Sequence, residues 1–272
     1  MATQTTGSDR GVLDPETGRA HFHLERPAPA PDLVPWVDRH WIVAWDLRGG
    51  APFTQEVLSF PNVNLAIEPD TADVHGVRTG LGAHTIAGAG RVVGTKLRPG
   101  AWRALAGEPA WCLTDRVVPL EAAFGPQARG LVAEVRAATE VGDAVALVEA
   151  FLRRRLPEEP DPVAAEVAAV VDAMLASPAG TTVAGVAAAH GVSPRTLQRL
   201  FREHVGVSPK AVLQRHRLHA AAERIAQDAA HDWAALAVDL GYADQAHFIN
   251  DFRAAIGRTP AQFAAACGGA QP

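Results

Sequence analysis

The pattern of hydrophobic and polar positions changes character about half-way along the chain. Between His21 and Glu121, short alternating or β-rich stretches are separated by segments that contain Gly and Pro, and residues 41–47, 53–60 and 63–67 are examples. Apolar and polar residues that alternate with a period of two, between turn residues, are typical of strands with one buried face. This part of the chain is therefore predicted to be β-rich.

Helical spacing replaces alternation from Gln127 onward, where apolar residues recur three and four positions apart. The segment 156–162 is polar and contains three prolines, which interrupt helices. We therefore predict an α+β fold with a boundary near residues 157–180. The expected parts are a disordered tail (1–20), a β-rich effector or dimerisation domain with C-terminal helices (21–160), a linker and first helix (161–180) and an all-α domain (181–272).

The C-terminal part contains an internal repeat. At an offset of 50 or 51, the chain aligns Val183, Val186, Ala187, Gly191, Phe201, Val205, Gly206, Pro209 and Val212 with Trp233, Leu236, Ala237, Gly241, Phe252, Ile256, Gly257, Pro260 and Phe263. Each copy has the pattern of a helix, a tight turn and a second helix. Gly191 and Gly241 stand where the first helix must end, because Gly adopts the left-handed conformation without steric cost. Ser193 and Asp244 are expected to cap the second helix of each copy.

Residues 209–227, between the two copies, are also predicted to be helical. The basic residues of this segment, which are spread around apolar ones, are Lys210, Arg215, Arg217 and Arg224. One continuous helix would hold the two units at a fixed separation, as binding to two sites on one face of a DNA duplex requires.

Polar side chains are predicted to face outward from the second helix of each copy. They are Arg195, Thr196, Gln198 and Arg199 in the first copy and Gln245, His247 and Asn250 in the second. Arginine can form two hydrogen bonds with guanine in the major groove, and glutamine can do the same with adenine. A solvated helix face has a similar composition, so the repeat is what favours DNA contact. The first helix has the stronger set of base-contacting side chains.

The segments GVSPRTLQRLF with VGVSP, and GYADQAHFINDF with IGRTP, resemble the two helix-turn-helix repeats of the AraC/XylS family of bacterial transcription regulators. The likeness covers both copies and the segment between them. It implies a bipartite site on double-stranded DNA, with RNA polymerase at the promoter as a further partner. The base-contacting roles that the resemblance implies fall on Arg195, Gln198, Arg199, Gln245 and Asn250. Asn250 stands where the family often has an arginine, so a strong contact there is in question.

The stretch that contains LRPGAW and LTDRVVPLEAAFG resembles an uncharacterised N-terminal domain found in many actinobacterial-type regulators. In the wider family this region is a sensor or dimerisation domain. The resemblance therefore implies a small-molecule effector and a second copy of the chain as partners. Two alternatives remain open. One is a ligand-binding or enzymatic N-terminal domain to which DNA binding is secondary, and the other is a protein-interaction dimeriser that uses helices within 128–156.

Composition supports a folded protein but does not by itself indicate a DNA partner. The chain has 272 residues, of which 48% are hydrophobic and 20% charged, and its net charge is −5. Residues 181–272 contain nine Lys and Arg against seven Asp and Glu, whereas residues 1–180 carry −7. The placement of the arginines, rather than a strongly basic domain, therefore has to support DNA binding.

Other candidate chemistry is sparse. Four tryptophans are candidates for an effector pocket, with core packing as the simpler alternative: Trp41, Trp45, Trp102 and Trp111. His21 and His23 could place two imidazoles on one face of a strand but lack a third metal ligand. Cys112 is expected to be buried and structural. We find no catalytic motif, so we predict no enzyme, no cofactor and no metal. The start of the chain is polar, and no apolar run is long enough for a membrane span, so a cytoplasmic location is expected.

Overall fold

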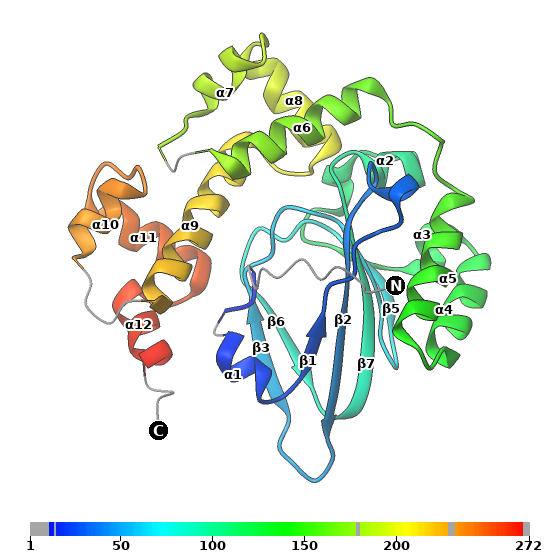
Figure 1. Ribbon diagram of the computed structural model, residues 1–272. Coiled ribbons are helices and arrows are strands. Elements are labelled where there is room, and N and C mark those ends of the chain that lie inside the picture. The colour runs from blue at the N-terminus through cyan, green and yellow to red at the C-terminus, as the bar shows by residue number, and fades with distance from the viewer. Residues whose placement is uncertain (1–10, 14, 178–179, 228–231, 269–272) are drawn as a thin grey trace.

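The computed structural model describes residues 11–13, 15–177, 180–227 and 232–268, and it confirms the α+β fold (Figure 1). Two antiparallel sheets form the N-terminal half, one with six strands in the order β1-β2-β7-β4-β5-β8 and one that pairs β3 with β6. The strands are β1 (His23–Glu25), β2 (Val37–Leu47), β3 (Phe53–Val57), β4 (Asn64–Ile67), β5 (Ala72–His75), β6 (Gly82–Ile86), β7 (Gly88–Leu97) and β8 (Val117–Pro119). The stretches predicted as strands at 41–47, 53–60 and 63–67 correspond to β2, β3 and β4.

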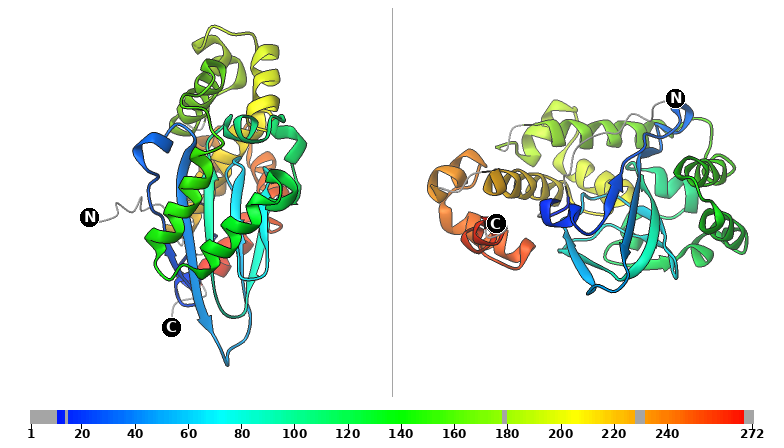
Figure 2. Two further views of the ribbon diagram at one scale, coloured as in Figure 1. Left: turned by 90° about the vertical axis from the view of Figure 1, so that its right-hand side faces the viewer. Right: turned by 60° about the horizontal axis from the view of Figure 1, so that its bottom comes forward.

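One face of the six-stranded sheet packs against helices (Figure 2). These are α3 (Leu120–Phe124), α4 (Gln127–Ala137) and α5 (Val141–Arg153). Helix α4 begins at Gln127, where the sequence changes to helical spacing, whereas α3 begins before that point. Val93 and Leu97 of β7 and Phe151 of α5 belong to one buried hydrophobic cluster here. Buried His40 of β2 contacts Thr95 Oγ1 at 2.9 Å and Glu149 Oε1 at 3.3 Å. Because these polar groups have partners, they fix the position of α5 on the sheet without a large desolvation cost.

The predicted disordered tail does not extend over all of residues 1–20. Residues 1–10 lie outside the described residues. Leu13 is 5% exposed, Val12 forms an isolated bridge with Val57, and α1 (Pro15–Arg19) follows. The expectation of disorder is therefore wrong for the described part of 11–20, because Leu13 has an apolar cluster to pack into.

The C-terminal half is all-helical, as predicted. Its helices are α6 (Pro162–Ala176), α7 (Val183–Ala189), α8 (Pro194–His204), α9 (Pro209–Gln227), α10 (Trp233–Asp239), α11 (Gln245–Ile256) and α12 (Pro260–Gly268). Two separate hydrophobic clusters lie along α9. One joins α6, α7 and α8 to the start of α9, and the other joins α10, α11 and α12 to its end. Each helix-turn-helix unit therefore has its own core, and α9 contributes to both.

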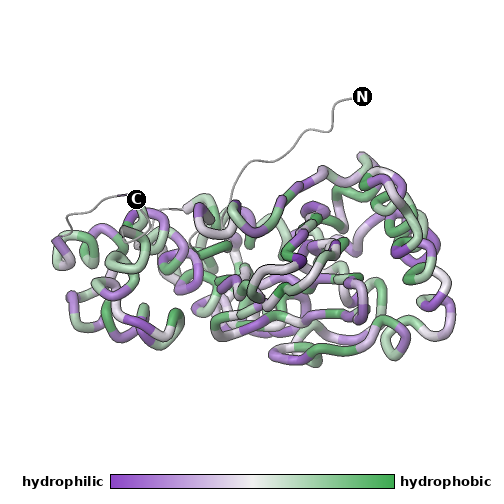
Figure 3. Tube along the Cα trace, turned by 90° about the horizontal axis from the view of Figure 1, so that it is seen from below, coloured by the Kyte–Doolittle hydropathy of each residue, from purple (hydrophilic) through white to green (hydrophobic). Residues whose placement is uncertain are grey.

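The two units begin and end at the residues that the repeat predicts. Ser193 accepts a hydrogen bond from the backbone N–H of Thr196, and Asp244 accepts one from the N–H of His247. Gly191 and Gly241 have φ of +64° and +75°, so both adopt the left-handed conformation at the turn. Figure 3 shows hydrophilic and hydrophobic positions interleaved along these helices, as expected for helices with one buried face. No helix among the described residues is long and apolar enough to cross a membrane.

The N-terminal half packs against both units. The short helices α2 (Ala101–Ala106) and η2 (Ala110–Leu113) contact α8, and the Gly100 N–H donates to the His204 carbonyl oxygen at 2.9 Å. Thr114 donates to the Gly206 carbonyl at 2.7 Å. On the other unit, Leu13 and Leu58 belong to the hydrophobic cluster of α10–α12. Both units are therefore in direct contact with the β-rich half.

Candidate nucleic-acid interface and interior cavity

Helix α8 presents its predicted polar side chains to solvent. Leu197 and Phe201 are buried on the opposite face, and they fix the rotation of the helix. Arg195, Gln198 and Arg199 are exposed. Thr196 is only half-exposed, and its hydroxyl lies 2.9 Å from Ser193 Oγ, so it takes part in the helix cap. Three of the four predicted side chains are therefore free to reach a DNA groove.

Arg199 is also held by neighbouring charges. Its guanidinium lies 3.6 Å from Glu203, one turn further along α8, and its side chain remains 67% exposed. Glu203 in turn pairs with Arg103 of α2 in the N-terminal half. An exposed ion pair of this kind contributes little stability, so Arg199 can leave it for a base or a phosphate.

Helix α11 of the second unit has a similar arrangement. Phe248 and Phe252 are buried, whereas Gln245, His247 and Asn250 are exposed. The imidazole of His247 lies 3.7 Å from Asp251. The second unit therefore exposes two neutral amides and a histidine where the first exposes two arginines.

The basic residues of α9 have a role that spacing alone does not predict. Arg215 is buried and donates hydrogen bonds to the carbonyl oxygens of Arg78 and Thr79 in the N-terminal half. Arg217 donates to the Thr181 carbonyl at 3.1 Å. Gln214 donates to Asp251 of α11 at 2.8 Å. These contacts fix α9 to its surroundings. The only sign of this role in the sequence was that the long basic side chains of α9 are flanked by apolar residues.

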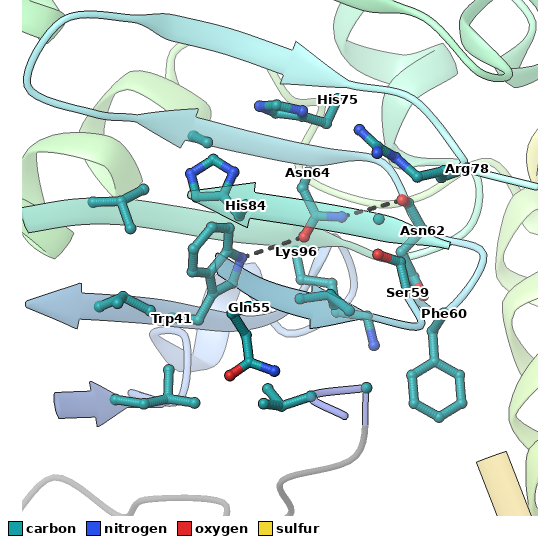
Figure 4. A pocket seen from close by; sticks show the side chains of 18 of the residues that line it. Trp41, Gln55, Ser59, Phe60, Asn62, Asn64, His75, Arg78, His84 and Lys96 are labelled. Atoms are coloured by element: carbon teal, nitrogen blue, oxygen red, sulfur yellow. Dashed lines mark hydrogen bonds between the residues drawn. The ribbon is translucent and has the colours of Figure 1, made fainter. Parts of the chain in front are cut away.

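A cavity of about 280 Å³ lies between the two sheets (Figure 4). Its floor is the face of the six-stranded sheet that the helices leave open, and β3 and β6 form its opposite wall. Its apolar lining includes Phe22, Leu24, Trp41, Val43, Val57, Phe60, Ile86 and Val92. Its polar lining includes Arg26, Arg39, Gln55, Ser59, Asn62, Asn64, Glu68, His75, Arg78, His84 and Lys96. A mostly apolar hollow with a few convergent polar groups is typical of small-molecule sites.

The four predicted tryptophans do not gather at this cavity. Trp41 lines it, and its indole N–H donates to Asn64 Oδ1 at 3.3 Å. Trp45 bonds the Ala87 carbonyl, and Trp102 is 3% exposed within the core. Trp111 is 44% exposed and lies 4.5 Å from the guanidinium of Arg202 on α8. The search for tryptophans in the sequence therefore identified one lining residue, Trp41. The cationic lining residues were not predicted, because their positions depend on how the strands pair.

The remaining sequence candidates lie apart from these two sites. His21 precedes β1 and stacks on Phe53 with ring centroids 3.8 Å apart, so it does not share a strand face with His23. Cys112 is half-buried rather than buried. Within the described residues, no group of three or more metal-ligating side chains is found.

Two protein families match the chain. A family described as a helix-turn-helix domain matches residues 186–266, and a domain of unknown function (DUF6597) matches residues 25–119. An AraC-like transcription regulator from Streptomyces antibioticus is 31% identical over 162 residues. That alignment covers 56% of this chain and 50% of the relative, so the chain spans about half the length of the curated relative it matches.

Three solved structures of regulators show some similarity to this chain. The C-terminal domain of the response regulator AraT from Geobacillus stearothermophilus is 25% identical over 39% of this chain and 86% of that chain, with a TM-score of 0.35. A regulator with an AraC-type DNA-binding domain from Chromobacterium violaceum is 27% identical over 38% and 90%, with a TM-score of 0.33. ToxT from Vibrio cholerae with bound unsaturated fatty acid is 9% identical over 93% and 94%, with a TM-score of 0.39. All three scores are below 0.5, so the family assignment rests on the sequence matches.

Proposed function

This chain belongs to the AraC family of transcription regulators, and from that premise we propose how it acts. Its two helix-turn-helix units bind a bipartite site on double-stranded DNA, and a small molecule in the N-terminal cavity controls that binding. The observation that carries the proposal is the pair of capped helices, α8 and α11, whose polar faces are exposed and whose cores share the single helix α9.

The geometry supports contact with two segments of the major groove. An α-helix fits the major groove, and half-sites read from one face lie about one helical turn, or 10 base pairs, apart. Arg195, Gln198 and Arg199 supply the base contacts of the first unit. Gln245 and Asn250 supply those of the second, with His247 beside them. Because arginine forms the stronger contacts, we assign most of the sequence discrimination to α8.

The cavity is positioned to influence the DNA-binding units because two of its lining residues also touch α9. Phe60 stacks on His219 of α9 with ring centroids 4.0 Å apart. The carbonyl oxygen of Arg78 accepts a hydrogen bond from Arg215 of α9. A ligand that moves either lining segment therefore changes contacts of the helix that holds the two units together. Differential contact of this kind is what effector control requires.

The test is selection of a duplex from a random library with the full chain, followed by binding titrations. We expect one bipartite sequence to be enriched and its affinity to fall steeply with salt, by a slope of about −0.9 per phosphate contacted. Arg199→Ala should lose about 1 to 3 kcal/mol at one base pair and tolerate other bases there. Gln245→Ala should act on base pairs about one helical turn away.

Arg48→Ala is the matched control, because Arg48 is an exposed arginine that pairs with Asp46 in the N-terminal half. It should leave DNA affinity unchanged. A flat salt response, or enrichment of no sequence, would count against DNA recognition. Turnover of a substrate by the full chain without any effect on DNA affinity would favour the enzymatic alternative.

In the cell we place the protein in the cytoplasm with its promoter DNA and RNA polymerase. Self-association through helices within 128–156 has less support. All residues of α4 and α5 are among those that the structure describes, and neither helix exposes a large hydrophobic side chain. A dimer would need another surface.

A further inference from the structure

A row of polar side chains crosses the floor of the cavity. The strand register pairs Arg39 of β2 with Lys96 of β7, Lys96 with Asn64 of β4, and Asn64 with His75 of β5. All four line the cavity. Residues paired across neighbouring strands project from the same face. Two cations, an amide and an imidazole therefore lie side by side, and Figure 4 shows Lys96, Asn64 and His75 of this row.

The next row of the floor is flat and apolar. Trp41 of β2 pairs with Gly94 of β7, and Gly94 pairs with Ala66 of β4. A Cβ on Gly94 would lie 1.9 Å from the Trp41 ring, so the indole covers the glycine backbone closely. Val43 and Val92 are paired in the row beyond and also line the cavity. A cationic edge and an aromatic floor are therefore direct neighbours.

The positive charge of the first row is only partly balanced inside the protein. One carboxylate, Asp38, lies 2.8 Å from Arg39 Nε and 3.2 Å from Lys96 Nζ. Burial alone would raise the pKa of Asp38, but the two cations hold it below its ordinary value, so this carboxylate is ionised. Burial lowers the pKa of Lys96, with Asp38 opposing part of the shift. The charged form of Lys96 therefore gains from any further anion in this poorly hydrated place.

In the described lining as a whole, cationic side chains outnumber carboxylates. Four cationic side chains line the cavity, those of Arg39 and Lys96 together with Arg26 and Arg78. Against them stands a single lining carboxylate, Glu68, which lies 3.2 Å from His84 Nε2. A cavity lined in this way disfavours cationic ligands and favours anionic ones.

We propose that the ligand of this cavity is a small organic carboxylate with a planar apolar body. Its carboxylate contacts Lys96 and Arg39, and its body lies against Trp41 and the valines beyond. The cavity volume of about 280 Å³ is at the small end of ligand sites, which suits a body of one or two fused rings. The assignment rests on the proposed role of the cavity as the effector site.

The first test compares 2-naphthoate with its neutral counterpart 2-naphthamide by isothermal titration calorimetry on the full chain without DNA. The acid should bind about ten-fold or more tightly than the amide, because only the acid carries a negative charge that can form ion pairs with Lys96 and Arg39. Equal affinities, or no binding of the acid at millimolar concentration, would overturn the proposal.

Two variants should change the affinity for 2-naphthoate in opposite directions. Lys96→Gln removes a cation and should weaken binding about ten-fold, whereas Asp38→Asn removes the internal competitor and should tighten it several-fold. Loss of folding would weaken binding in both, so tightening in Asp38→Asn cannot come from misfolding. Weakening in both variants would contradict the role of the cationic row.

Two further variants separate the charged group from the planar body. Trp41→Leu should weaken the binding of the acid and of the amide by the same factor, because it removes the aromatic floor of the cavity but no charge. Arg48→Gln, which removes one exposed positive charge outside the cavity lining, should leave both affinities unchanged. If Arg48→Gln and Lys96→Gln lost the same affinity for 2-naphthoate, the effect would be one of net charge alone, and the proposed site would be refuted.

A DNA titration with and without 2-naphthoate separates this assignment from the proposed function. Carboxylate-selective binding that leaves DNA affinity unchanged would support the ligand class and reject effector control. Sequence-specific DNA binding by a chain that binds no planar carboxylate would leave the DNA-binding role standing and reject the ligand class.

Discussion

Glycines allow close packing at several positions of the β-rich half. A Cβ on Gly90 would lie 2.6 Å from the ring of Trp45, much as one on Gly94 would meet Trp41. Gly76 follows β5 and passes the backbone of Leu113, where a Cβ would lie 1.7 Å from the carbonyl oxygen. Each glycine therefore makes room for a group that a side chain would displace, and at Gly76 that group is backbone, which cannot rotate away.

Gly76→Ala should destabilise the protein by about 2 kcal/mol or more, because an extra methyl group in a filled site forces a backbone shift. Urea unfolding followed by tryptophan fluorescence measures the change. The control is Gly80→Ala, since a Cβ at Gly80 meets nothing within 4 Å. If the two variants lost the same stability, the close approach at Leu113 would not be the cause.

At the scale of the helix, side-chain caps define where the DNA-binding elements begin. Thr182, Ser193, Asp232 and Asp244 each accept a backbone N–H at the start of α7, α8, α10 and α11. These N–H groups have no partner within the helix, so a side-chain oxygen satisfies them. The first residues of α8 and α11, which carry predicted base contacts, are ordered by these caps.

Asp244→Ala should cost about 1 kcal/mol of folding free energy, whereas Asp244→Ser should cost little, because serine also caps a helix. Thermal unfolding of the two variants gives the comparison. Asp239→Ala removes another exposed carboxylate, which pairs with Arg224 on the surface, and it should stay within about 0.5 kcal/mol of the parent. An Asp244→Ser variant as unstable as Asp244→Ala would argue against capping.

At the scale of the whole molecule, buried groups join the β-rich half to the helical half. His204 ends α8, accepts a hydrogen bond from the Gly100 N–H through its carbonyl oxygen, and is only 5% exposed. Burial lowers the pKa of His204 from 6.5. The charges around it partly cancel, since Arg103 and Arg199 lower the pKa further and Glu203 and Asp161 raise it.

The sign of the resulting pH dependence follows from this lowered pKa. Well above pH 6.5, His204 is neutral in both the folded and the unfolded chain, so its packing contributes fully. As the pH falls below 6.5, the unfolded chain takes up the proton first, and stability is lost. We expect His204→Gln to show a smaller fall in unfolding free energy between pH 7.5 and 5.5 than the parent protein. All other titrating groups are common to both proteins, so parallel curves would exclude His204 as a cause.

The helical half could be predicted in detail because its signals are local. The repeat, the left-handed Gly191 and Gly241, and the caps at Ser193 and Asp244 all depend on residues within a few positions of each other. The exposed positions of Arg195 and Arg199 follow from helical period alone. Family, fold class and the candidate base-contacting face were therefore available before any tertiary contact was known.

The cavity was decided only by tertiary structure. Arg39 and Lys96 are neighbours because β2 pairs with β7 in one register, and a slip of one strand by one residue would turn its side chain to the opposite face and separate the pair. The contact of Arg215 with the carbonyl oxygens of Arg78 and Thr79 likewise depends on how the two halves dock. Register and docking arise from the summed packing of segments far apart in the chain, so no local pattern contains them.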